Sequence, residues 1–170
     1  MQRHENVLIQ QVIAGDQTAY EQLYKQYSAR VYAICLRLLA TRAKAEEATQ
    51  ETFVQIWQQL PHFRADSQFS TWLHRIAVNT AIDSWRQDKF ARLLDEADLD
   101  LIAEPAQELQ LLDKLILKLP KQARAVFVLF AIEGYQHQEI AKLLQIAEGS
   151  SKAQYHRARQ LLQEWLNAAE

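Results

Sequence analysis

A basic stripe near the C-terminus is the clearest chemical signal in this sequence. Its members are Lys152, His156, Arg157 and Arg159, and no acidic residue lies between Gly149 and Gln163. Positive side chains on a helix that fits the major groove can contact phosphates and guanine edges. The stripe therefore indicates DNA binding. An ordinary basic surface helix within a bundle is the alternative.

The segments around this stripe predict a helix-turn-helix. A short helix is expected over 136–144 and a long one from 150 to about 166, with a tight connection over 145–149. Two helices joined in this way present the second one to the major groove. Their apolar residues should pack together: Ile140, Ala141 and Leu144 against Ile146, Tyr155, Ala158 and Leu162.

A second polar set lies on a helix predicted after Thr41 and ended by Pro61. One side of this helix is expected to be buried and carries Ala45, Thr49, Phe53, Ile56, Trp57 and Leu60. The other side carries Glu47, Gln50, Glu51 and Gln58 around a lone Val54. Polar residues around one apolar contact suit a reversible protein interface, although a solvated helix face would look the same.

A short loop over 62–67 precedes a fourth helix with a polar stripe of Arg75, Asn79, Asp83 and Arg86. Aromatic and polar loop residues can hold an unstacked base. Asn79 offers both a donor and an acceptor, and the arginines can hold phosphates. Trp72 and Trp85 fit either core packing or base stacking, with core packing favoured.

No pattern in the chain is typical of an enzyme. The five histidines lie apart without metal-ligand spacing, and there is neither a glycine-rich phosphate loop nor an activated-nucleophile motif. The single Cys35 cannot form an intramolecular disulfide and lies in an apolar stretch. A buried small hydrophobic residue is the favoured interpretation, ahead of a redox or metal role. We expect no catalytic activity, no metal and no cofactor.

Composition predicts an all-α protein. The 170 residues include only three Gly and three Pro and are dominated by good helix formers. The net charge of −2 is unevenly distributed, because residues 93–112 hold six acids and no base while both flanking parts are mildly basic. We therefore predict a four-helix domain over 1–90, a flexible acidic linker over 91–107 and a helix-turn-helix domain over 108–170. The longest apolar run, 125–132, is too short to cross a bilayer, which together with the polar N-terminus predicts a cytoplasmic protein.

Several motifs resemble those of the extracytoplasmic-function (ECF) group of bacterial RNA polymerase sigma factors. The run KAEEATQETFVQIW at 44–57 is similar to their core-polymerase-binding helix, and FRADSQFSTWLHRIAVNTA at 63–81 to their promoter-melting region. In the second half, Leu119-Pro120, Glu133-Gly134, Glu139-Ile140-Ala141 and the stretch 149–159 resemble their second domain. Order and spacing agree over nearly the whole chain.

The resemblance implies specific roles for residues of this sequence. Promoter −10 recognition and melting would fall to Phe63, Arg64, Ala65, Asp66, Ser67, Arg75, Asn79 and Arg86. Recognition of the −35 element would fall to Gly149, Ser150, Lys152, Ala153, His156, Arg157 and Arg159. Core polymerase would be bound by Glu47, Gln50, Glu51, Val54 and Gln58.

The resemblance also implies partners and places the acidic segment. The partners are the clamp helices of the largest polymerase subunit, the flap of the second largest, promoter DNA and, as a further candidate, an anti-sigma factor. The linker would thread near the active-site cleft and RNA exit channel, where its six carboxylates could mimic RNA. A charged, solvated spacer is the alternative for this segment.

Three residues depart from the family pattern. Gln145 stands where a glycine is frequent, Ser151 replaces an apolar anchor, and Gln154 replaces a base. These changes are expected to affect −35 binding and to leave the fold intact. The competing hypothesis is a conventional helix-turn-helix regulator with a helical dimerisation or sensor domain, which would not need the loop at 62–67 or the polar third helix.

Overall fold

The computed structural model describes residues 2–94 and 110–170, which form helices and turns and contain no strand. The first half holds α1 (Gln2–Ile13), α2 (Gln17–Leu39), α3 (Arg42–Gln59), the short 3₁₀ helix η1 (Leu60–His62) and α4 (Phe69–Leu94). The second half holds α5 (Leu111–Leu117), α6 (Lys121–Phe127), the π-helical turn η2 (Val128–Ile132), α7 (His137–Leu144) and α8 (Glu148–Ala168). The predicted all-α class is confirmed.

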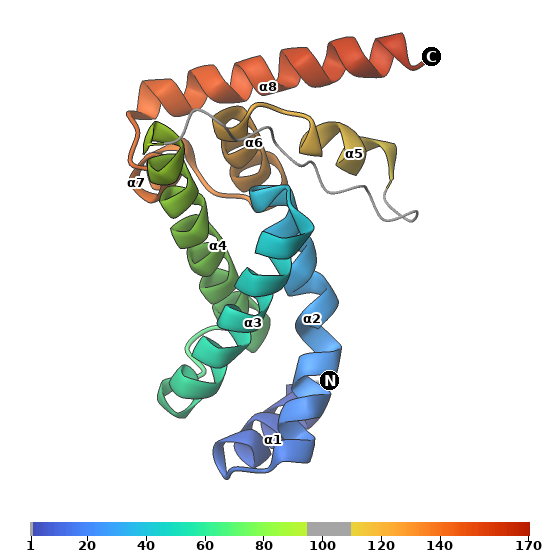
Figure 1. The fold of residues 1–170 in the computed structure, drawn as a ribbon. Coiled ribbons are helices and arrows are strands. Elements are labelled where there is room, and N and C mark those ends of the chain that lie inside the picture. Colours follow the sequence, from blue (N-terminus) through green and yellow to red (C-terminus); the bar gives the residue numbers. More distant parts are fainter. Residues whose placement is uncertain (1, 95–109) are drawn as a thin grey trace.

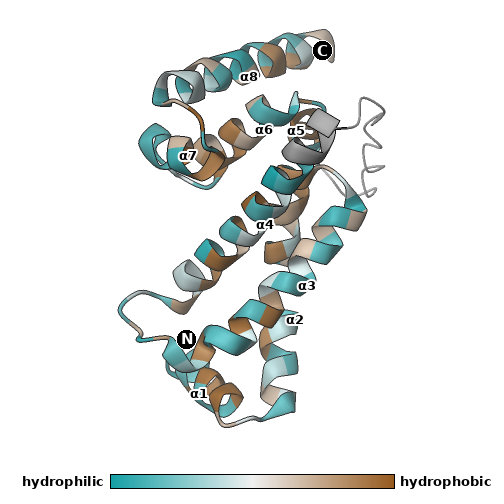
Figure 2. Ribbon diagram, turned by 60° about the vertical axis from the view of Figure 1, so that its left-hand side comes forward, coloured by the Kyte–Doolittle hydropathy of each residue, from teal (hydrophilic) through white to brown (hydrophobic). Residues whose placement is uncertain are grey.

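Helices α2, α3 and α4 run alongside one another and α1 crosses the foot of α2 (Figure 1). Their hydrophobic stripes face inward, so polar surfaces point to solvent (Figure 2). The predicted stripe of α2 is buried from Leu23 to Leu38, and Phe53 and Ile56 of α3 meet it. Trp85 of α4 is only 1% exposed, so the prediction of core packing is confirmed for this tryptophan.

Local sequence explains where the helices begin and end. The Asp16 carboxylate accepts hydrogen bonds from the backbone N–H groups of Thr18 (2.9 Å) and Ala19 (3.2 Å) and so caps α2. Gly134, at φ +78°, follows η2 and turns the chain toward α7. Helix α4 continues to Leu94, past the predicted domain boundary at residue 90.

Most of the predicted linker lies outside the described residues. This applies to the six carboxylates of the predicted acidic segment, namely Asp95, Glu96, Asp98, Asp100, Glu104 and Glu108. Their proposed mimicry of RNA therefore stays a prediction.

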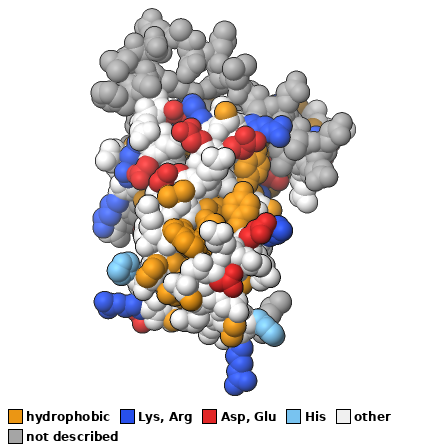
Figure 3. All heavy atoms as spheres, turned by 60° about the horizontal axis from the view of Figure 1, so that its bottom comes forward, with side chains coloured by type: hydrophobic (Ala, Val, Ile, Leu, Met, Phe, Trp, Pro, Cys, Tyr) orange, Lys and Arg blue, Asp and Glu red, His pale blue; other side chains and the backbone are white. Residues whose placement is uncertain are grey.

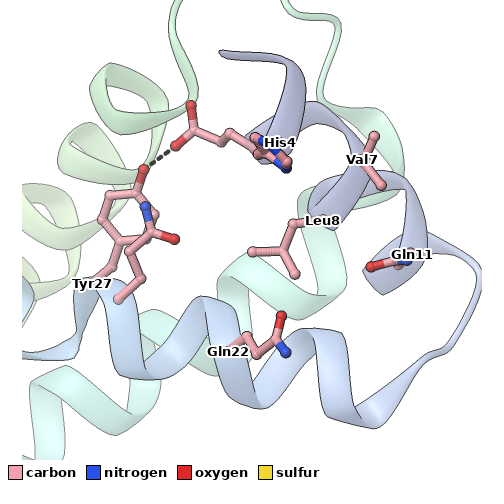
Figure 4. Close-up of a pocket in the computed structure, with 8 residues that line it drawn as sticks. His4, Val7, Leu8, Gln11, Gln22 and Tyr27 are labelled. Carbon is pink, nitrogen blue, oxygen red and sulfur yellow. Dashed lines mark hydrogen bonds between the residues drawn. The ribbon is translucent and has the colours of Figure 1, made fainter. Parts of the chain in front are cut away.

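Helix α1 leaves a hollow of about 550 Å³ against α2 (Figure 4). Ile9 and Val12 anchor α1 in the core, and the hydroxyl of Tyr27 donates a hydrogen bond to the Glu5 carboxylate. Hydrophobic side chains gather at the surface of this end of the molecule (Figure 3). Val7, for example, is 56% exposed.

The two halves of the chain touch through polar contacts. Arg37 of α2 pairs with Asp113 of α5 at 3.0 Å, both side chains being largely shielded from solvent. The guanidinium of Arg86 in α4 donates to the backbone carbonyl of Leu143 in α7. These contacts hold α4 against α7 and α2 against α5 and α6 (Figure 1).

A third contact joins His74 of α4 to Glu133 at 3.3 Å. Burial, with help from Arg30 and Arg75, lowers the pKa of His74 below its usual value. The imidazole is therefore neutral at neutral pH. A neutral imidazole can meet the carboxylate by donating a hydrogen bond from Nε2–H, without forming an ion pair.

Cys35 is fully buried, and burial raises the pKa of its thiol to about 11. A thiol of this kind is almost wholly protonated at neutral pH and is shielded from reagents. The structure thus supports the interpretation of Cys35 as a small core residue. Across 2–94 and 110–170, no helix combines the length and hydrophobicity that a bilayer crossing requires.

Candidate DNA- and polymerase-binding surfaces

A groove of about 540 Å³ lies between α3 and α4. Four of the five residues predicted to contact polymerase line it from α3: Glu47, Gln50, Glu51 and Val54. Helix α4 lines the other side with Asp83, Ser84, Gln87 and Asp88. The fifth predicted residue, Gln58, is exposed one turn further along α3. The structure therefore gathers the predicted set on one exposed, acidic face.

Trp57 was expected in the core but is 41% exposed. Its ring packs edge-on against Tyr20, with 4.8 Å between ring centroids. One turn after Tyr20 on α2, Tyr24 is 39% exposed, and the centroid of its ring lies 4.7 Å from that of Phe53. Exposed aromatic residues are typical anchors of protein interfaces, so Trp57 and Tyr24 are further candidates for the polymerase-binding face. The position of Trp57 at the edge of the apolar stripe of α3 was the signal in the sequence that could have added this residue to the candidate polymerase-binding face.

The predicted −10 loop combines a fixed aromatic wall with free polar groups. Phe63 is half-buried and packs on Trp72, with 5.1 Å between ring centroids. Phe69 completes this aromatic cluster. The four following loop residues are exposed: Arg64, Ala65, Asp66 and Ser67. Ala65 has φ +58°, a left-handed conformation that turns the chain sharply at the tip.

The polar stripe of α4 divides into two parts. Arg75 and Asn79 are one turn apart and exposed, so both remain available to DNA. Arg86 is engaged, since its guanidinium donates to the Leu143 carbonyl and lies 3.5 Å from Asp83. Arg86 is thus committed to the second half of the chain as long as α4 and α7 are in contact.

Helices α7 and α8 form the predicted helix-turn-helix. Ile140 and Leu144 of α7 and Ala158 and Leu162 of α8 are buried as expected. The Glu139 carboxylate accepts the backbone N–H of Gln136 at 2.9 Å, which closes a capping box at the start of α7. Helix α8 lies across the end of the molecule (Figure 1).

All seven residues predicted to meet the −35 element are exposed on the N-terminal part of α8: Gly149, Ser150, Lys152, Ala153, His156, Arg157 and Arg159. Lys152 lies 3.6 Å from Glu148 in an exposed pair that contributes little to stability. The Arg159 guanidinium sits 5.9 Å from the centre of the Tyr155 ring. The face can therefore offer its cations to phosphate or base edges at little cost.

Gln145 ends α7 in a left-handed conformation, with φ 57° and ψ 47°. Side chains with a Cβ pay about 1–2 kcal/mol in this region, whereas glycine does not. The expected cost of this departure from the family pattern is thus supported by the backbone geometry. The turn forms nevertheless, because its N–H bonds to the Ala141 carbonyl and the apolar face of α8 packs on α7.

Replacing Gln145 with glycine should raise the free energy of unfolding by about 0.5–1 kcal/mol. Relief of the left-handed strain would exceed the entropy that glycine adds to the unfolded chain. The matched control is Gln163→Gly in the exposed middle of α8, which should lower stability by about the same amount. Urea denaturation measures both. Equal destabilisation by the two glycines would show that the turn is unstrained.

Within the described residues, no three His, Cys, Asp or Glu side chains come close enough together to hold a metal ion. The candidate binding surfaces are two exposed polar faces on the first half and one basic helix face on the second.

Comparison with known families gives two matches in chain order. Residues 23–90 match the model described as Sigma-70 region 2, and residues 109–162 match Sigma-70, region 4. The chain is 34% identical to the ECF RNA polymerase sigma factor SigW of Bacillus subtilis, with 93% of this chain and 94% of that protein covered. It is 28% identical to the RNA polymerase sigma-H factor of Pseudomonas aeruginosa, over 95% and 93% of the two chains.

Two solved structures share the fold. One is the sigma factor RpoE in complex with the anti-sigma factor NepR from Bartonella quintana, with a TM-score of 0.60 and 24% identity over 89% of this chain and 98% of that chain. The other is CnrH in complex with the cytosolic domain of CnrY, with a TM-score of 0.54 and 25% identity over 96% and 97%.

Proposed function

The chain belongs to the ECF family of RNA polymerase sigma factors, and we propose that it binds core polymerase through α3, reads −10 DNA with the 63–67 loop and α4, and reads −35 DNA with α8. It would act in the cytoplasm, where polymerase and promoters are. As a non-enzymatic factor, it supplies binding and leaves the chemistry of RNA synthesis to the polymerase.

The groove between α3 and α4 is the observation that supports polymerase binding most strongly. It presents Glu47, Gln50 and Glu51 around Val54, which is 48% exposed. A single exposed apolar residue among carboxylates and amides suits an interface that forms and dissociates during each initiation cycle. Trp57 and Tyr24 would extend this surface.

The first half would open the promoter by capturing a base. Phe63, fixed against Trp72, would provide a stacking wall, and the exposed backbone and side chains of 64–67 would bond the base edge. Asn79 and Arg75 of α4 would hold the adjacent strand. A flipped base needs both a wall and polar partners, and the loop provides both.

We further propose that the two predicted domains, whose described parts are residues 2–94 and 110–170, separate when promoter DNA is bound. The −10 and −35 elements lie about 25 base pairs apart, or roughly 85 Å at about 3.4 Å per base pair. A compact chain of this length is on the order of 40 Å across. A molecule closed by the contacts of Arg37, His74 and Arg86 could not reach both elements. An extended segment of the length of residues 95–109 could span about 50 Å, enough for the separated domains.

Arg86 supports the same conclusion from chemistry. A guanidinium that donates to the Leu143 carbonyl is not available to a −10 phosphate. Separation of the domains would free it at the moment when the DNA arrives. The closed arrangement would thus compete with promoter binding for the same side chain.

Reversing one charge of the pair between Arg37 and Asp113 should open the free chain. Asp113→Arg would place two cations where an ion pair at 3.0 Å now stands, and the open fraction should rise roughly fivefold, as for a loss of about 1 kcal/mol. The double variant with Arg37→Asp restores opposite charges and should close the chain again. Energy transfer between dyes on cysteines introduced at Gln22 and Gln163, both exposed, measures the opening. If the double variant is as open as the single one, the pair does not hold the domains together.

Co-purification with core polymerase tests the proposed function against its competitor. A sigma factor should elute with the core enzyme as a one-to-one complex. A conventional helix-turn-helix regulator would instead form a dimer that ignores core polymerase and binds a palindromic duplex. An anti-sigma factor as a further partner of this chain stays a prediction.

A further inference from the structure

Ser151 is the fourth residue of α8 and is fully buried, at a position where the family pattern has an apolar residue. A buried hydroxyl without a partner destabilises the fold, because it loses its hydrogen bonds to water. In this chain the hydroxyl has one: the Oγ of Ser151 and Nδ1 of His137 share a hydrogen bond of 2.8 Å. His137 is the first residue of α7, so the bond joins the N-terminal turns of the two helices of the helix-turn-helix.

Aromatic rings fix the imidazole in this position. The ring of Phe130 stacks on His137, with 4.3 Å between centroids and planes only 13° apart. Tyr155 of α8 meets the same imidazole edge-on at 5.8 Å and contacts Phe130 at 4.5 Å. The imidazole therefore has little freedom to turn its Nδ1 away from Ser151.

The side of α8 that packs against α7 and η2 sets the rotation of this helix about its own axis. Ser151, Tyr155 and Arg159 recur every four residues, so they lie on one side of the helix. The first two face α7 and η2, and the third carries its guanidinium over the Tyr155 ring. Lys152 and His156 each follow one of these residues by one position, or about 100° around the helix. A small rotation at Ser151 would thus move every candidate DNA contact on α8.

We propose that His137 and Ser151 are a matched pair of positioning residues that set how α8 is presented to −35 DNA. This proposal rests on the proposed sigma function and adds two residues that touch no DNA themselves. Either residue alone would be a liability: the serine would be an unpaired buried hydroxyl, and the histidine would lose the partner that orients it. The pair would act through the position of Lys152, His156 and Arg159.

The test uses full-length variants assembled with core polymerase. The probe is a promoter recovered by run-off transcription with the unaltered holoenzyme, together with the same promoter carrying a scrambled −35 element. Ser151→Val and His137→Ala should each lower initiation on the intact promoter about tenfold. Neither should change the low activity on the scrambled one or the affinity for core polymerase.

Rescue distinguishes positioning from simple loss of stability. The double variant His137→Phe with Ser151→Val replaces the hydrogen bond by an apolar contact of similar size and should recover most of the activity. The same −35-specific loss in the double variant as in the singles, or full activity in either single, would overturn the pairing. If no promoter is recovered with the unaltered protein, the proposed sigma function itself fails, which is a separate result.

Discussion

Val54→Lys should weaken binding to core polymerase at least about 30-fold. The side chain is 48% exposed in the groove between α3 and α4, so lysine can be accommodated without disturbing the core. In the complex, however, the apolar contact of Val54 would be lost, and the lysine ammonium would lose its water and draw the neighbouring Glu47 and Glu51 carboxylates away from the partner, which costs about 2 kcal/mol or more. Titration of labelled core polymerase with the variant measures the loss.

The matched control is Val7→Lys on α1, because this valine is 56% exposed and lies outside the groove. The control should bind polymerase like the parent. Equal weakening by the two lysines would point to a general effect of charge. If Val54→Lys binds as tightly as the parent, this face of α3 is not the polymerase interface.

Removing Lys152, His156 and Arg157 together should reduce initiation at −35-dependent promoters about 100-fold. Each side chain that reads a base edge contributes about 1–3 kcal/mol, and a phosphate contact contributes less. All three are exposed on α8, so truncation to alanine should leave the helix-turn-helix folded. Transcription by the reconstituted holoenzyme on a recovered promoter measures the loss.

Bulk charge provides the control for the triple variant. Lys25→Ala with Arg42→Ala also removes two positive charges, from exposed positions on α2 and α3. This control should retain nearly full activity, because counterion effects alone are not specific to the −35 element. If both variants lose activity equally, α8 contributes charge and no recognition.

The helices themselves could be predicted from sequence, because their signals are local. Recurrence of apolar residues every three or four positions identified α2, and the connection predicted over 145–149 separated α7 from α8, although α8 begins two residues earlier than expected, at Glu148. The stop at Gly134 is similarly encoded by the residue itself. The exposure of the candidate −35 residues followed from the same periodicity.

Trp57 shows where periodicity fails. It lies at the boundary of the apolar stripe of α3, where a shift of a few tens of degrees decides between core and surface. Tyr20 of α2 occupies the position beside α3 that a buried Trp57 would need. The Tyr20 hydroxyl donates a hydrogen bond to the Phe53 carbonyl at 3.0 Å, and its ring packs edge-on against Trp57. Only the packing of α2 on α3 determines this outcome.

The polar contacts between separate helices could not be predicted. Arg37 and Asp113 are 76 residues apart, and nothing in the sequence indicates that Arg86, for which we predict a −10 phosphate contact, donates to the Leu143 carbonyl 57 residues away. Ser151 was recognised as a departure from the family pattern, but its partner His137 lies 14 residues away on another helix. Such pairs depend on how helices pack against one another in three dimensions, which the helix propensities of single residues do not predict.

Run-off transcription of a genomic library with core polymerase, in the presence and absence of this chain, tests the central claim most directly. With the chain, transcripts should begin at discrete sites that share sequence near −10 and −35, and these sites should vanish when Val54 is changed to lysine. The free chain, tested in parallel, should bind the same duplexes only weakly. Tight, specific binding of those duplexes by the chain alone, with no new transcript from the polymerase, would contradict the assignment and favour a conventional helix-turn-helix regulator.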